Sequence, residues 1–95
     1  MNKYEIMFIV KSDMEEVEIK KTAESLKSVL TSKNAKVLEE KAMGQRDLAY
    51  EINKFKTGYY FLFVVEASAD AIEEFNRVVG INECVLRHLV IKKED

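Results

Sequence analysis

Residues 44–52 read GQRDLAYEI and residues 57–65 read TGYYFLFVV, and these two segments decide how the rest of the chain folds. Apolar and aromatic side chains recur in both, as is typical of strands. The polar connector between them, Asn53–Gly58, carries two lysines and ends on a glycine. Two strand-like segments joined by a short glycine-containing connector predict a β-hairpin in the middle of the chain.

The length and composition predict one globular domain, residues 1–95. Hydrophobic residues make up 47% and charged residues 34%, which is the balance of a folded protein rather than a disordered one. A chain of this size buries only about 60% of its unfolded surface, which leaves little room for a deep active site. A net charge of −2 argues against coating nucleic acid through bulk positive charge, but it allows a small local patch of cations.

The sequence carries no signal for export or for crossing a membrane. No run of about 18 apolar residues is present, and Glu5 lies where a signal peptide needs apolar residues. The single cysteine, Cys84, excludes an internal disulfide and suits a reducing compartment. We therefore expect a cytoplasmic protein with no membrane association.

N-terminal to the hairpin, the sequence predicts a strand followed by a helix. Apolar side chains dominate one face of Lys3–Lys11 at the alternating spacing of a strand. Ser12 and Glu15 then have the spacing of a helix-capping box, and apolar residues recur at helical spacing as far as about Ser32. Asn34 suits the left-handed conformation that ends many helices.

The first strand of the hairpin is expected to be long, Ala35–Ile52, with a bend or bulge at Gly44. A second helix is predicted to begin near Ser68, where Asp70 has an acidic residue three positions on, at capping-box spacing. Gly80 is predicted to end that helix. The remaining strands are predicted at Tyr59–Glu66 and Glu83–Lys92.

This order of elements is the α+β ferredoxin-like arrangement, β-α-β-β-α-β. Right-handed crossovers place both helices on one face of a four-stranded antiparallel sheet. The other face of the sheet is then uncovered, although the strands carry apolar residues on both faces. The residues expected to pack under the helices are Ile6, Phe8, Phe61, Phe63 and Val65.

The uncovered face of the sheet is expected to be apolar and to bind a partner. A soluble monomer rarely exposes a contiguous patch of several large apolar side chains. The alternation of the last strand leaves open which of its two faces joins this patch. The expected members are Met7, Ile9, Tyr60, Leu62 and Val64, with either Leu86, His88 and Val90 or Arg87, Leu89 and Ile91.

The sequence carries no enzyme or metal motif. Cys84 and His88 are four residues apart on a strand, or about 13 Å, which is beyond hydrogen-bond reach and supplies too few metal ligands. Lys11–Glu16, which follows the first strand, lacks the glycine and arginine of an acylphosphatase phosphate loop and the Cys-x-x-Cys of a copper chaperone. We expect no catalytic activity, no cofactor, no metal and no small-molecule substrate.

Cationic and aromatic residues gather around the hairpin. Lys54 and Lys56 lie in the connector, Arg46 lies on the first hairpin strand, and Arg87 lies on the last strand. With the tyrosines, of which Tyr4 is one, they resemble the mixture that RNA sites use, cations for phosphates and flat rings for bases. The pattern indicates a small RNA-binding patch.

The sequence also resembles a known family, the bacterial small-subunit ribosomal protein six. The string Gly-x-Arg-x-Leu-Ala-Tyr-x-Ile at residues 44–52 is the most specific part of the resemblance, which covers nearly the whole chain. Residues 58–60, residues 85–90 and Tyr4, Glu5 and Ile9 complete it. The resemblance implies a non-catalytic protein of the cytoplasmic ribosome that binds the central domain of 16S ribosomal RNA as a heterodimer with small-subunit ribosomal protein eighteen.

The resemblance and the chemistry together assign residues to two surfaces. Asp47 stands where many relatives carry a second basic residue, which weakens that part of a phosphate site, and Glu51 stands where some relatives carry proline. The residues expected to bind RNA are Arg46, Lys54, Lys56, Arg87 and Tyr4, and those expected to bind the partner protein are Met7, Ile9, Tyr60, Leu62 and Leu89.

Two other functions stay open from the residues alone. One is a protein-only interaction module of the same fold that dimerises through its open sheet face. The other is a small ligand-sensing domain with no chemistry of its own. Salt-dependent binding to the 16S central domain separates the ribosomal hypothesis from both.

Overall fold

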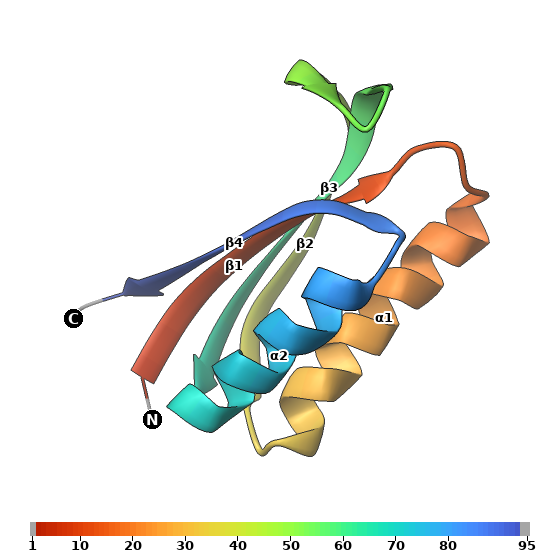
Figure 1. Ribbon diagram of the computed structural model, residues 1–95. Helices are drawn as coiled ribbons and strands as arrows, with labels where there is room; N and C mark the ends of the chain where they lie inside the picture. Colours follow the sequence, from red (N-terminus) through yellow and green to blue (C-terminus); the bar gives the residue numbers. More distant parts are fainter. Residues whose placement is uncertain (1, 94–95) are drawn as a thin grey trace.

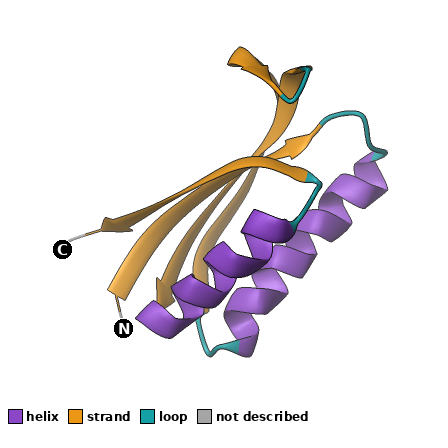
Figure 2. Ribbon diagram, viewed as in Figure 1, coloured by secondary structure: helices purple, strands orange, loops and turns teal. Residues whose placement is uncertain are grey.

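The computed structural model describes residues 2–93 of the chain. Its elements are β1 (Asn2–Lys11), α1 (Glu16–Ser32), β2 (Lys36–Ile52), β3 (Phe55–Ala67), α2 (Ala69–Ile81) and β4 (Val85–Lys93). The strands form one antiparallel sheet in the order β2-β3-β1-β4, and both helices cover the same face of it (Figures 1 and 2). The predicted ferredoxin-like fold is confirmed.

The core lies between the two helices and one face of the sheet. The ring of Phe8 stacks on Phe61 and meets Phe63 edge-on, with 5.2 Å between ring centroids in each pair. Leu26 of α1 and Phe75 of α2 are fully buried against them. The predicted helix-facing residues are confirmed, since all of them are buried: Ile6, Phe8, Phe61, Phe63 and Val65.

The hairpin is confirmed, but its connector is shorter than predicted. Only Asn53 and Lys54 form the turn, with φ values of 49° and 71°. Positive φ at both central residues matches the twist of the flanking strands, and asparagine tolerates it well. The strand therefore resumes at Phe55, and Gly58 lies inside β3 rather than at the end of a loop.

The predicted start of α1 is wrong. Ser12 does not cap the helix, because the chain first turns at residues 12–14 and Glu15 occupies the N-cap position without a side-chain hydrogen bond. The Ser12 hydroxyl instead lies 2.8 Å from the Thr57 hydroxyl on β3. The predicted left-handed stop is confirmed, since Asn34 has a φ of 65°.

The second helix starts near the predicted position but is capped by a different residue. The Ser68 hydroxyl accepts a hydrogen bond from the backbone N–H of Ala71, so Asp70 lies within the first turn, where its charge suits the helix dipole. The predicted end is one residue early. Gly80 stays helical, and α2 continues to Ile81 with Asn82 as the C-cap.

Strand β2 is irregular, and its last irregularity lies next to the hairpin turn. Gly44 has a φ of 88° at a shift in the β2–β3 register, which confirms the predicted bend. A larger shift follows, because Asp47 pairs with Thr57 and Ile52 pairs with Phe55. Four β2 residues, 48–51, therefore stand opposite a single β3 residue. The end of the hairpin rises from the sheet on the side away from the helices (Figure 1).

Candidate nucleic-acid and protein interface

The sheet face that the helices leave uncovered, called here the open face, has an apolar centre. Strand register settles the face of β4 that the sequence left open, because Met7 pairs with Leu89 and Ile9 pairs with Arg87. Paired residues lie on the same face of a sheet, so Arg87, Leu89 and Ile91 belong to the open face. The structure brings all predicted partner-binding residues together as this apolar centre: Met7, Ile9, Tyr60, Leu62 and Leu89.

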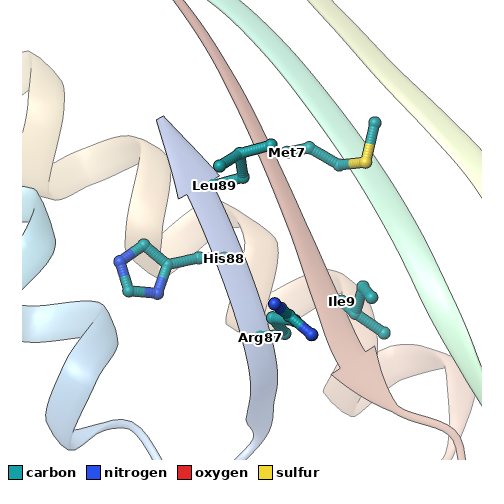
Figure 3. Close-up of a pocket in the computed structure, with 5 residues that line it drawn as sticks. All are labelled: Met7, Ile9, Arg87, His88 and Leu89. Carbon is teal, nitrogen blue, oxygen red and sulfur yellow. The ribbon is translucent and has the colours of Figure 1, made fainter. Parts of the chain in front are cut away.

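The apolar centre contains a shallow pocket of about 260 Å³ between β1 and β4. Figure 3 shows Met7, Ile9, Arg87 and Leu89 around it, while the His88 ring points to the helix side. Leu89 is 55% exposed and its neighbour Ile91 is 45% exposed. The surface is therefore apolar and accessible, with one guanidinium group at its margin.

The end of the hairpin packs onto one end of the open face. A Cβ atom on Gly58 would collide with Cγ2 of Ile9 and would lie 3.4 Å from Cδ2 of Leu48. Leu48 thus lies over Gly58, beside the point where Ile9 of β1 packs against the backbone of β3. This packing explains why Ile9 is only 9% exposed although it lies on the open face.

A second contact joins the hairpin to the opposite edge of the sheet. The guanidinium carbon of Arg87 lies 5.6 Å from the centre of the Tyr50 ring, within cation–π range. Arg87 is on β4 and Tyr50 is on β2, the two edge strands. Edge strands of a four-stranded sheet are about 14 Å apart. The segment 48–51 must therefore bend across the open face for the two side chains to meet.

Five cations surround the place where the hairpin meets the sheet, and they are called here the cationic end. Arg46 pairs with Gly58 and is exposed, Lys54 lies in the turn, and Lys56 is exposed beside it. Sequence reasoning missed Lys11, which pairs with Gly58 from the other side; its position as the last residue of β1 was the available signal. Within residues 2–93, none of the five forms an ion pair: Lys11, Arg46, Lys54, Lys56 and Arg87.

Polar groups at the base of the hairpin frame a second, wider hollow. Gln45, Arg46, Asp47 and Thr57 line this hollow of about 520 Å³. Asp47 pairs with Thr57 and follows Arg46 directly, so strand alternation turns the two side chains to opposite faces. Both residues nevertheless line this hollow on the edge strand, so the Asp47 carboxylate still shares it with Arg46.

Tyr4 is not part of this cluster. It pairs with Val65 and Lys92 near the start of β1, and it packs against the core on the helix side. Six residues of extended strand, about 20 Å, separate it from Val10 at the hairpin end of the sheet. The contact of Tyr4 with RNA stays a prediction, and the position of Tyr4 away from the hairpin end of the sheet does not support it.

Neither a metal-ligand cluster nor a membrane-spanning helix is found among residues 2–93. Within residues 2–93, no three His, Cys, Asp or Glu side chains are grouped so that they could hold a metal ion. Among the described helices, none has the length and apolar character needed to cross a membrane. Burial on the helix side lowers the pKa of His88 from its ordinary value of 6.5 and favours its neutral form.

Comparison with known proteins identifies a family. The family model described as Ribosomal protein S6 matches residues 3–92. The chain is 50% identical over its full length to small ribosomal subunit protein bS6 of Halalkalibacterium halodurans, all of which is covered. It is 44% identical over 98% of its length to the whole of the protein of that name in Phytoplasma australiense. The crystal structure of 30S ribosomal protein S6 from Thermotoga maritima superposes with a TM-score of 0.93 at 25% identity, over 97% of this chain and 87% of that one.

Proposed function

This chain belongs to the ribosomal protein S6 family of the small ribosomal subunit, and on that premise we propose that it binds the central domain of 16S ribosomal RNA jointly with small-subunit ribosomal protein eighteen. It acts on the cytoplasmic ribosome as a structural component without catalytic activity. One observation carries the proposal: the apolar centre directly adjoins the cationic end, since Ile9 and Arg87 are register partners.

The apolar centre is the surface proposed for the partner protein. Leu89 and Ile91 are about half exposed, and covering them gains roughly 25 cal/mol for each Å² of apolar surface removed from water. Arginine is enriched at protein interfaces and serves equally well for phosphate. Arg87, at the margin, therefore stands where the partner protein and the RNA meet.

The cationic end is the surface proposed for RNA phosphates. Guanidinium groups bind phosphate oxygens through paired N–H donors, and Arg46 and Arg87 have no ion-pair partner among residues 2–93 to compete. The chain as a whole carries a net charge of −2, which opposes RNA binding. Tight binding therefore requires the partner protein to contribute positive charge and contact area.

The exposure of Leu89 and Ile91, together with the acidic net charge, also favours a second candidate. In that candidate the apolar centre joins two copies of this chain, and the protein is an interaction module without RNA. A homodimer of this kind would hide the same surface that the partner protein needs. The two candidates therefore differ in what they predict for RNA binding.

The test is a titration of a 16S central-domain fragment with this chain alone, with the partner protein alone, and with both. The proposal expects strong binding only with both proteins, and an affinity that falls with salt between about 50 mM and 200 mM. No binding in any of the three titrations would overturn it. A homodimer that survives addition of the partner protein would favour the interaction module.

A further inference from the structure

We propose that Tyr50 is a positioning residue that holds Arg87 and the hairpin cations in one surface for RNA phosphate. This inference rests on the proposed function and deepens it. It assigns a task to the segment 48–51, which the strand register alone leaves as an irregularity. The tyrosine itself is 57% exposed, so burial in a core does not explain its placement.

The contacts of the hairpin show how Tyr50 reaches its position. Leu48 packs over Gly58 and Ile9 and fixes the start of the segment on the open face. Side chains two residues apart on an extended segment point the same way, so Tyr50 follows Leu48 towards the sheet. Its ring then meets the guanidinium group of Arg87 from the opposite edge strand.

The contact leaves the binding capacity of Arg87 intact. A cation–π contact engages the charge of the guanidinium group and consumes none of its five N–H donors. Within residues 2–93, Arg87 makes no side-chain hydrogen bond and no ion pair. Its N–H donors therefore remain available for a phosphate, and the contact with Tyr50 orders the guanidinium group before RNA binds.

Holding Arg87 in advance makes binding more favourable. A free arginine side chain loses rotamer freedom when it binds, and an ordered one has lost part of it beforehand. Arg46 is held separately, because the β2–β3 pairing places it opposite Gly58 on the same face as Ile9 and Arg87. Two phosphate contacts from opposite edges of the sheet thereby become one preformed surface.

The experiment is a double-mutant cycle on RNA affinity of the chain together with its partner protein. Tyr50→Leu should weaken binding about threefold to tenfold, the range of one cation–π contact, while Tyr50→Phe should stay close to wild type. In an Arg87→Ala background, Tyr50→Leu should have no further effect. An undiminished effect in that background would overturn the proposal.

A second measurement on the free chain separates this inference from the proposed function. The Hδ protons of Arg87 should show a ring-current shift by NMR that disappears in Tyr50→Leu and persists in Tyr50→Phe. If the chemical shift of these protons is the same in Tyr50→Leu as in wild type, the proposal is overturned, even if the protein pair binds RNA. If the wild-type pair of proteins does not bind RNA while the ring-current shift is present, the proposed function fails and this role of Tyr50 fails with it.

Discussion

Gly58 of β3 faces Ile9 of β1 so closely that a single added methyl group would overlap the Cγ2 methyl of Ile9. Isoleucine branches at Cβ, so this methyl group is held close to the backbone and cannot swing away as the end of a long side chain would. The glycine thus permits the close approach that lets Leu48 settle over the sheet. The position of the hairpin depends on this pair.

The first prediction is that Gly58→Ala destabilises the protein by about 1–3 kcal/mol, the usual cost of overpacking. The matched control is Gly80→Ala on α2, where a new Cβ meets nothing within 4 Å and the backbone is helical. That change should stabilise by about 0.4–1 kcal/mol. Urea denaturation of the two variants measures both effects, and equal signs would contradict the packing described for Gly58.

The second prediction separates the two faces of the sheet. Phe8 is fully buried under the helices and touches two other aromatic rings, so Phe8→Ala should cost about 3–5 kcal/mol of unfolding free energy. Leu89 on the open face is 55% exposed, and Leu89→Ala should change stability by only about 0.5 kcal/mol. Comparable losses at both positions would show that the open face is covered in the free protein.

The third prediction concerns pH. Burial lowers the pKa of His88 below 6.5, so the unfolded chain takes up this proton at a higher pH than the native one. Neutral His88 therefore makes its full contribution to the unfolding free energy above pH 6.5. This contribution decreases as the pH falls through 6.5 and stops changing below the pKa of His88 in the native state.

Unfolding free energies between about pH 7.5 and pH 5.5 test this, because most carboxylates titrate lower. The wild-type value should decrease with falling pH, and the decrease should shrink in His88→Gln, which has no proton to take up. If the unfolding free energy of His88→Gln changes with pH as much as that of wild type, another group causes the effect.

Much of the fold could be predicted because its signals are local. The periodicity of apolar residues in β1 and the two helices reflects which side chains face the core. The residues predicted to lie under the helices are buried as expected. The helix starts were predicted less well. Ser12 has the chemistry of a cap, but a tertiary hydrogen bond to Thr57 uses its hydroxyl instead, and sequence spacing alone does not reveal such a competitor.

The candidate site was predicted only in part for a related reason. The apolar centre follows from strand alternation. The sequence therefore correctly predicts that its members lie on the same face of the sheet. The Tyr50–Arg87 contact joins opposite edges of the sheet through the irregular segment 48–51. Its geometry depends on a register shift that no pattern in residues 44–52 specifies.

The most direct test of the joint RNA and protein surface is the salt dependence of RNA affinity for the chain with its partner protein. Arg46→Ala and Arg87→Ala are compared with Arg77→Ala, an exposed arginine that pairs with Glu74 on α2. The first two variants should each bind about tenfold more weakly, as expected for a lost charge-assisted contact. Each should also lower the magnitude of the slope of log Kobs against log salt by about 0.7–0.9, the loss of one phosphate contact. Arg77→Ala should match wild type in both quantities. Unchanged slopes for Arg46→Ala and Arg87→Ala, or an equal loss for Arg77→Ala, would contradict the assignment of RNA binding to the cationic end.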